Sequence, residues 1–453
     1  MRRPSALLAA LAVAISLGGP SQAQEYSVSY AAGGRDAAGR FMGGTEMRLL
    51  VAHAGWLYGG NGYWEDQPGP EGRQAPQILV LDSPRAAWRV DHAFDERMGN
   101  GRPRDLAVGA LFEAGFGTDG RGAALPQRVS LLIASNWDLT GATRVFTRDD
   151  ATGAWIASTL AQDRPDANFL PQIRNFGTHR DRVTGADLVF AGQDPRGIFS
   201  GVYDPTVAGR LRWSTAPELD LSSVSTVGIS GRNGYLRVTS FAEANSGLYA
   251  AVGQQIYERI DGPSPNWRLV YTNPRPGHSE TGLRGLTAIP GPGGDVLLAA
   301  VEGNAGRIVR IDPRTGGEAN ELDIADFLGR SWGMPVNYTI TAYNDMAKIG
   351  GSLLMGVMAF VPRNAALPSG HAIVDVGYGQ VEAGAWYLIR SADAHYALRR
   401  VSADFGHPLV AVRTIAQSPF ANDAAVYFGG YDANKAPAHN TAWIARAPIA
   451  AMH

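Results

Sequence analysis

The chain has 453 residues and contains no cysteine. This absence excludes disulfide bonds, thiolate metal sites and cysteine nucleophiles, so packing alone must hold the fold together. An excess of charge is missing as well, because 40 basic residues balance 42 acidic ones and leave a net charge of −2. Without a whole-chain field to attract a polyanion, we expect no nucleic-acid partner.

Long apolar runs are equally scarce. The most prominent one, residues 6–17, contains 12 residues before Gly18 interrupts it, whereas a membrane-spanning helix needs about 20. Two arginines precede this run, and a small-x-small site that ends at Ala23 follows it. The pattern is typical of an export signal rather than of a membrane anchor. We predict a signal peptide over residues 1–23, no membrane insertion, and a secreted or periplasmic mature protein.

Local catalytic motifs are also absent. The sequence has no HxH, HxxH or HExxH metal motif, no nucleophile elbow, no P-loop and no dinucleotide-binding fingerprint. It therefore predicts no metal site and leaves any cofactor undetermined. A metal ion held by side chains from separate blades stays an alternative, since four histidines lie in or near predicted loops, namely His179, His278, His371 and His439.

Turn-forming residues, in contrast, are abundant. With 56 Gly and 27 Pro beside 45% hydrophobic residues, the composition favours a turn-rich globular protein of the all-β class. A short phrase of apolar residues at strand spacing, closed by small or polar residues, occurs seven times. The copies lie at residues 55–62, 130–137, 187–194, 247–254, 295–302, 352–359 and 424–431. A period of roughly 50 to 75 residues is typical of four-stranded propeller blades with variable loops.

The flanks of each copy suggest the rest of a blade. Another apolar run usually precedes the phrase, and a strand that ends in Asp and then a Trp strand often follow it, as at Asp82 and Trp88. Glycine pairs close the first and last copies, at residues 59–60 and 429–430. In these residues the chain resembles the kelch-type propeller repeat. The resemblance implies close strand approach at the paired glycines and Trp packing between blades, and it carries no catalytic residue with it.

We predict a single domain over residues 24–453, a seven-bladed β-propeller. The blades are expected at about residues 45–95, 102–165, 172–222, 233–273, 282–328, 336–403 and 408–450. The last blade lacks an outermost strand, and the alternating segment 26–30 is predicted to supply it and to close the ring. Because closure removes exposed sheet edges, a disulfide-free protein can stay stable, and we expect a monomer.

The loops after the repeated phrase should crowd one mouth of the central channel, and the widest are residues 62–74 and 359–384. Near the start of the inner strand an arginine recurs in five blades: Arg48, Arg104, Arg174, Arg237 and Arg284. Convergence of these side chains would create a positive funnel for carboxylates, sulfates or phosphates. The alternative is that each arginine pairs with a nearby acidic residue, such as Glu46, Asp105 or Glu280.

Other candidate site residues are expected at the same mouth. Tyr63, His179 and His439 are candidates for moving a proton. The predicted substrate-binding set also includes Trp64, Trp137, Asp194, Glu302 and Tyr431. For His179 an alternative place stays open, in a hairpin on the opposite face, where it would be solvated.

Two functions follow from this interpretation. The first is an exported enzyme, a lyase or hydrolase, that acts on a glycan or another polyhydroxylated, anionic substrate. The second is a non-catalytic propeller that binds a protein or a small-molecule ligand with the same loops. An enzyme should place a tyrosine, histidine or carboxylate with a shifted pKa beside an arginine, whereas a receptor should show a broad rim without such a group.

Overall fold

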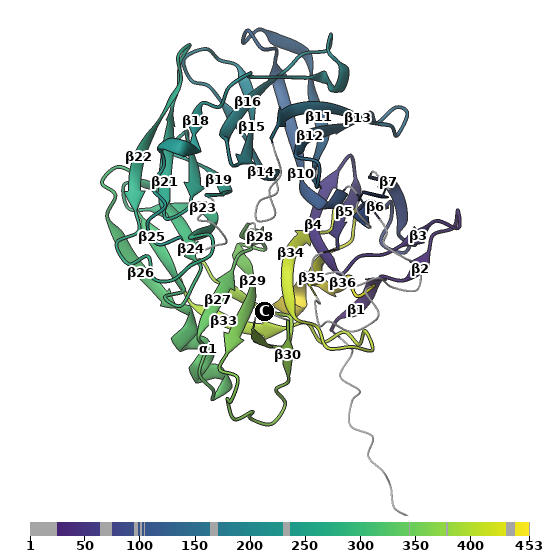
Figure 1. The fold of residues 1–453 in the computed structure, drawn as a ribbon, viewed down its shortest axis with the longest axis vertical. Coiled ribbons are helices and arrows are strands. Elements are labelled where there is room, and N and C mark those ends of the chain that lie inside the picture. The colour runs from purple at the N-terminus through teal and green to yellow at the C-terminus, as the bar shows by residue number, and fades with distance from the viewer. Residues whose placement is uncertain are drawn as a thin grey trace, which may run out of the picture.

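The computed structural model describes residues 25–63, 75–94, 98–99, 102–103, 105–163, 171–229, 236–343, 345–376, 379–431 and 440–452. Successive antiparallel sheets lie around a central axis (Figure 1). Their innermost strands contact one another around the axis, and each sheet continues outward through strands that follow in chain order. This radial arrangement is an all-β propeller.

The sheets from the first half of the chain are each built around four main strands. From the axis outward, the first sheet contains β4 (Glu46–His53), β5 (Trp56–Gly62), β6 (Gln77–Leu81) and β7 (Arg89–Ala93), and the second contains β10 (Asp105–Thr118), β11 (Ala124–Asp138), β12 (Ala142–Arg148) and β13 (Trp155–Gln162). The third contains β14 (Gln172–Arg180), β15 (Asp187–Asp194) and β16 (Gly197–Tyr203), with β17 (Leu211–Trp213) and β18 (Leu219–Asp220) both paired to β16. The fourth contains β19 (Val238–Ala244), β20 (Gly247–Val252), β21 (Gln255–Ile260) and β22 (Asn266–Thr272).

The second half continues the pattern with one interrupted inner strand. The fifth sheet contains β23 (Leu283–Gly291), β24 (Gly294–Val301), β25 (Arg307–Ile311) and β26 (Glu318–Asp323). In the sixth, β27 (Tyr338–Thr341) and β28 (Ala347–Ile349) both pair with β29 (Ser352–Val361), and β32 (Trp386–Arg390) and β33 (Tyr396–Arg400) follow outward. The remaining sheet contains β34 (Ala411–Gln417), β35 (Ala425–Tyr431), β36 (Trp443–Pro448) and β1 (Ser27–Ala31). The helix α1 (Ile324–Trp332) follows β26 and buries Ile324, Leu328 and Trp332.

Several short strands and 3-10 turns lie outside these main strands. They are β2 (Gly34–Arg35) paired with β3 (Phe41–Met42), β8 (Met98–Gly99) paired with β9 (Arg102–Pro103), the hairpin of β30 (Ile373–Asp375) and β31 (Gln380–Glu382), and the 3-10 turns Ala208–Arg210, Leu221–Ser223 and Ile449–Met452. The hairpin of β30 and β31 lies within residues 359–384, which we expected to form a loop at the mouth along their whole length. Instead, β29 continues to Val361, and β31 pairs with its end. No helix in the described ranges is long and apolar enough to cross a membrane.

The repeated phrase forms the second strand of each sheet. In β24, for example, every residue from Val296 to Val301 is buried. This strand lies between neighbouring sheets and is covered on both faces, so its sequence is a continuous apolar run rather than an alternating one. The mainly aliphatic and aromatic clusters between adjacent sheets form the core.

Glycines in the second strand allow neighbouring sheets to approach closely. A Cβ added at Gly60 would lie 2.9 Å from a methyl group of Val108 on the next inner strand. At Gly192 the added Cβ would lie 2.5 Å from the Cβ of Val238. Real side chains do not tolerate such contacts in a close-packed core, so glycine at these positions sets the spacing of the sheets.

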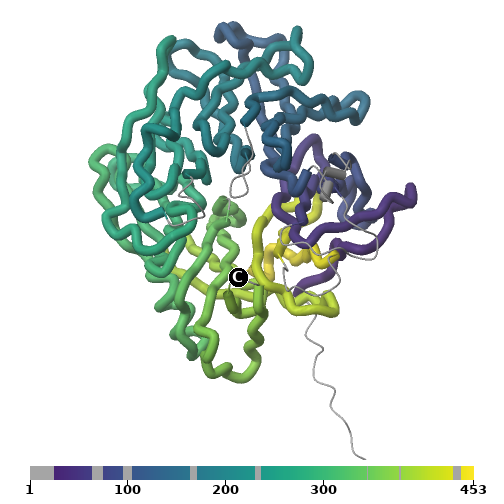
Figure 2. The backbone as a smooth tube through the Cα atoms, viewed as in Figure 1, coloured from purple at the N-terminus to yellow at the C-terminus, as the bar shows by residue number. Residues whose placement is uncertain are grey.

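The two ends of the described chain lie in one sheet, and the purple start of the tube lies beside its yellow end (Figure 2). Strand β1 pairs antiparallel with β36, with Ser27 opposite Arg446 and Ala31 opposite Trp443. Just before β1, the hydroxyl groups of Tyr26 and Tyr387 are hydrogen bonded at 2.5 Å. The first described residues are therefore anchored to segments more than 300 positions away in the sequence.

Candidate functional site: an arginine and tyrosine cluster on the axis

Arginines at the starts of the inner strands gather near the axis. They are Arg48 in β4, Arg174 in β14, Arg237 immediately before β19, Arg284 in β23 and Arg413 in β34. Burial, together with the neighbouring charges of Arg237 and Arg48, lowers the pKa of Arg174 to about 10. The guanidinium groups from separate sheets thus face one another, as the recurrence of arginine in the sequence predicts.

Each of these arginines also has an acidic partner. Glu46 lies 3.4 Å from Arg48 Nε and 3.3 Å from Arg413 Nη2. The other pairs are Arg174 with Asp194 at 3.4 Å, Arg237 with Glu280 at 3.2 Å, and Arg284 with Glu302. Four of the five predicted arginines therefore come together, and each of them also pairs with a carboxylate, whereas Arg104 lies outside the described residues. The five guanidiniums exceed these four carboxylates by one charge.

A break in one inner strand brings a tyrosine into the cluster. Strand β27 ends at Thr341, β28 begins at Ala347, and both pair with β29, so the inner strand is interrupted by a bulge, of which Ala342, Tyr343, Asp345 and Met346 are described. Ala342 adopts a left-handed conformation, with φ of 52°, and its N–H donates to the carbonyl of Gly356. A side chain at Gly285 of the neighbouring sheet would collide with Ala342. The bulge therefore occupies space that glycine leaves open, and it carries Tyr343 and Asp345.

Tyr343 lies among the guanidinium groups. The Cζ atom of Arg413 is 3.7 Å from the centre of its ring, and that of Arg284 is 4.3 Å away. Burial opposes ionisation of the phenol, but the charges of Arg413, Arg284 and Arg174 outweigh it and lower the pKa of Tyr343 to about 7. The side chain stays partly exposed. Tyr343 is thus a phenol that can lose its proton at neutral pH.

Glu302 organises one side of the cluster. Its carboxylate accepts hydrogen bonds from Thr281, Tyr338 and Arg284. Burial raises the pKa of Glu302, but Arg284 and these hydrogen bonds outweigh burial and lower it. Glu302 therefore stays ionised and holds Arg284 against Tyr343.

Asp194 behaves differently, although it also faces an arginine. Burial raises its pKa to about 6, against the charges of Arg174 and Arg237. Its distance of 3.4 Å from Arg174 Nε is too long for a strong charge-assisted hydrogen bond. A carboxyl group in this state can exchange a proton near neutral pH.

Two aromatic residues of the predicted set pack against arginines. Trp137 lies beside both Arg48 and Arg174, whose Cζ atoms are each 5.8 Å from its ring. The ring of Tyr431 contacts Arg413, at 4.4 Å. Trp137 belongs to the predicted substrate-binding set; in the structure it is buried, and its ring packs against two guanidinium groups.

Two of the predicted catalytic residues, His179 and Tyr63, lie away from the arginine cluster. His179 sits near the far end of β14 from Arg174, about 17 Å away at the usual rise of a strand. It is buried between Glu243 and Asp261, so it is neither at the mouth nor solvated. Tyr63 is buried beside Gly43, outside the arginine cluster. The other predicted residues, Trp64, Arg104 and His439, lie outside the described residues.

Two members of the cluster, Arg413 and Tyr343, are not among the residues predicted from the sequence. Arg413 carries the same signal as the other arginines, an early position in the apolar run that precedes the phrase. Glu46 was named only as an alternative partner. Tyr343 has no local signal, because its sheet replaces the recurring arginine by a tyrosine in a bulge. Within the described ranges, no group of three or more His, Asp or Glu side chains is arranged to hold a metal ion.

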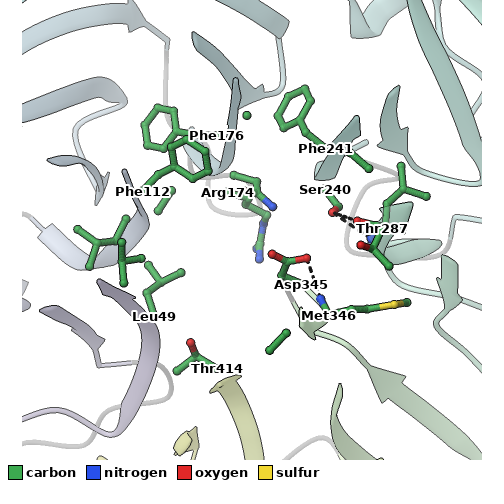
Figure 3. Close-up of a pocket in the computed structure, with 18 of the residues that line it drawn as sticks. Leu49, Phe112, Arg174, Phe176, Ser240, Phe241, Thr287, Asp345, Met346 and Thr414 are labelled. Atoms are coloured by element: carbon green, nitrogen blue, oxygen red, sulfur yellow. Dashed lines mark hydrogen bonds between the residues drawn. The ribbon is translucent and has the colours of Figure 1, made fainter. Parts of the chain in front are cut away.

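The cluster borders a cavity of about 560 Å³ that follows the axis (Figure 3). Arg174 and Arg413 belong to its lining, and Arg174 points into the space in the close-up. Asp345 projects into the same space, with one oxygen accepting a hydrogen bond from the N–H of Met346 at 2.7 Å. The cavity is thus bounded at the cluster by cationic groups.

Fold and site together define a β-propeller with a cationic, tyrosine-containing cluster on its axis. The chain matches no protein-family model and no curated protein, so the kelch resemblance stays an interpretation of the sequence. Among solved structures it is similar to the Dos1 propeller, with 11% identity, a TM-score of 0.41, and coverage of 92% of this chain and 82% of the other.

Two further solved structures show likenesses of the same order. Saccharomyces cerevisiae Sqt1 has 9% identity and a TM-score of 0.41, over 89% of this chain and 97% of the other. Trypanosoma rangeli sialidase in complex with sialic acid has 9% identity and a TM-score of 0.38, over 95% of this chain and 58% of the sialidase chain. Likenesses this weak carry no argument about function, which must come from the cluster itself.

Proposed function

We propose that this protein is an exported enzyme that acts on a polyhydroxylated, anionic substrate, and that the reaction is an elimination next to a carboxylate, as in the cleavage of a uronate-containing glycan. The observation that carries the proposal is the position of Tyr343. Its partly exposed phenol lies directly against the guanidinium groups of Arg284 and Arg413. A general base and two groups that can bind a substrate carboxylate are therefore next to each other.

The chemistry follows from this arrangement. Arginines at the cluster bind the substrate carboxylate and stabilise the negative charge that develops on it. The phenolate of Tyr343 removes the proton from the carbon next to that carboxylate. The electron pair of the broken C–H bond forms a C=C bond with the neighbouring carbon, whose bond to the glycosidic oxygen breaks. The departing oxygen takes that same proton from the newly neutral phenol, which returns Tyr343 to the phenolate with which the reaction began.

The test uses Tyr343→Phe and a panel of uronate-containing and sulfated glycans. Wild type should give unsaturated products, read by their absorbance, with kcat/KM rising as the pH rises through about 7. The variant should lose activity by about 100-fold or more, because it lacks the base. Tyr203→Phe, in β16 and away from the axis, is the control and should retain wild-type activity.

Other outcomes would contradict the elimination. New reducing ends without unsaturation would assign hydrolysis instead. Full activity of Tyr343→Phe would remove Tyr343 from the mechanism.

A second candidate function is a non-catalytic binding propeller. The observation that favours it is that every arginine of the cluster already pairs with a carboxylate of the protein. Arginines held in this way can recognise a ligand without taking part in a reaction. Binding of the panel without any product would support this function.

We also propose the finer architecture on which the enzyme depends. The sheets make seven blades, and β1 supplies the outermost strand of the last blade, as its pairing with β36 indicates. Export remains part of the proposal and rests on residues 1–23, which lie outside the described residues.

A further inference from the structure

The axial cavity has a layered wall. All the inner strands contribute to its lining, from β4 through β10, β14, β19, β23 and β28 to β34. Arg174 and Arg413 mark one level, near the starts of their strands. Two to four residues further along, the lining becomes apolar and partly exposed; its members are Val51, Phe112, Phe241, Ala288, Ala347 and Ile415. At about 3.3 Å per residue, this apolar layer lies roughly 10 Å below the arginines.

The phenylalanines of this layer are exposed to the cavity rather than fully packed. Phe112 and Phe241 are each partly exposed, whereas Phe176 beside them is buried. Figure 3 shows the three rings on one side of the space and Arg174 between them and Asp345. Apolar surface inside a narrow cavity gains free energy when a ligand displaces water from it. The volume of about 560 Å³ is within the usual range for small-molecule sites.

The charges on the lining favour an anion. Its cationic members are Arg174, Arg413 and Lys348, and its acidic members are Asp345 and Glu243. Glu243 is engaged by His179 at 2.7 Å. The lowered pKa of Arg174 reflects, after burial, the repulsion from Arg237 and Arg48, and an added negative charge would relieve that repulsion. Asp345 projects into the same cavity, opposes an anion there, and so gives a way to test the charge argument.

We propose that the axial cavity, which shares Arg174 and Arg413 with the cluster, also takes a small amphipathic carboxylate, with its acid group at these two arginines and its apolar body against Phe112, Phe241 and Ile415. This ligand differs from the polyhydroxylated substrate, which has no apolar body to bury. The site does not depend on a reaction at Tyr343, so it goes beyond the function proposed above.

The test is calorimetric titration with 4-phenylbutyrate as the probe. The uncharged 4-phenylbutanol should bind at least about tenfold more weakly, and so should butyrate, which lacks the ring. Phe241→Ala should weaken binding of the acid by about tenfold, because the ring contact is lost. Asp345→Asn should strengthen binding of the acid and leave the alcohol unchanged. Leu269→Ala, at an exposed position of β22, is the matched control and should have no effect.

Several results would overturn this site. They are equal affinity for acid and alcohol, tighter binding of 4-phenylbutylamine, unchanged affinity in Phe241→Ala, or no binding at millimolar concentrations. Ile415→Ala provides a second apolar variant if Phe241→Ala fails to fold. Tyr343→Phe should bind 4-phenylbutyrate at least as tightly as wild type, because it removes a negative charge beside Arg413, while it loses turnover of glycans. Failure of this site and failure of the proposed reaction are therefore distinguishable.

Discussion

Tyr343 owes its chemistry to residues far away in the sequence. Arg174, Arg284 and Arg413 come from three other sheets, and together they overcome the cost of ionising a phenol inside the protein. Glu46 acts in the opposite direction and raises the pKa of Tyr343. The pKa of about 7 is therefore a balance of identifiable charges, and removing one of them should shift it in a known direction.

Removal of the charge at Arg413 should raise the pKa of Tyr343. Arg413 is the strongest of the contributions that lower it, so Arg413→Gln should move the ionisation from about 7 towards the ordinary value of 10.0. Ultraviolet difference titration of tyrosinate measures this shift directly. Arg212→Gln, at an exposed arginine of β17, is the control and should leave the titration unchanged. An unchanged midpoint in Arg413→Gln would show that Arg413 does not control the phenol.

Sequence repetition predicts the arginines and fails for the tyrosine. Arg48, Arg174, Arg237 and Arg284 occupy equivalent positions of equivalent strands, and equivalent positions around an axis lie at one level. Tyr343 reaches the same place only because an inner strand breaks into β27 and β28, which depends on the space at Gly285 of another sheet. Such a position has no local signal.

At the scale of strands, two buried histidines join neighbouring sheets in the same way. His53 at the end of β4 contacts Glu113 of β10 at 3.2 Å and Asp150, after β12, at 2.9 Å. His179 near the end of β14 makes the same pair of contacts with Glu243 and Asp261 of the next sheet. Each ring thus has both nitrogens facing carboxylates, which accept hydrogen bonds from both only when the imidazole is protonated.

The link at His53 predicts a pH-dependent stability. Burial lowers the pKa of His53, but the hydrogen bonds to Glu113 and Asp150 outweigh it and raise the pKa above 6.5. Because the pKa in the folded state is the higher one, the stabilisation is complete below about 6.5 and is lost as the pH rises through the folded value. Relative to His53→Gln, wild type should be more stable by about 1 kcal/mol at low pH, since both carboxylates are partly exposed to water.

Denaturant unfolding from pH 5.5 to pH 9 measures this difference. The gap between wild type and His53→Gln should narrow as the pH rises. His395→Gln, at an exposed histidine of the turn before β33, is the control and should stay parallel to wild type. If the difference in unfolding free energy between wild type and His53→Gln stays constant or widens as the pH rises, protonated His53 does not join the two sheets.

The strands themselves were more predictable than the contacts between them. The phrase at residues 295–302 predicts β24 correctly, because a strand covered on both faces must be apolar along its length and such a run can be recognised from the local sequence alone. The place of His179 was harder to choose, since the sequence allowed either face of the propeller. The pairing of β14 with β15 puts it on the hairpin face, and its burial there depends on Glu243 and Asp261 from another sheet.

At the scale of the whole molecule, the pairing of β1 with β36 should stabilise the propeller. Deletion of residues 25–31 removes the buried rings of Tyr26 and Tyr30 and leaves β36 as an open edge. We expect the midpoint of thermal unfolding to fall by several degrees, as followed by circular dichroism. A synthetic peptide of residues 25–31 should restore it, whereas a peptide with both tyrosines replaced by serine should not. An unchanged midpoint after deletion would contradict the proposed closure.

The same pairing sets an order of events during folding. Ser27 and Arg446 are 419 positions apart, so the hydrogen bond between them cannot form until nearly the entire polypeptide has been made available. Contacts of such long sequence separation form slowly, because their loop-closure entropy must be overcome first. Until then, both β1 and β36 expose unpaired backbone groups that can join with other chains. A partner that shields either strand during this interval would raise the yield of folded protein without changing its final stability.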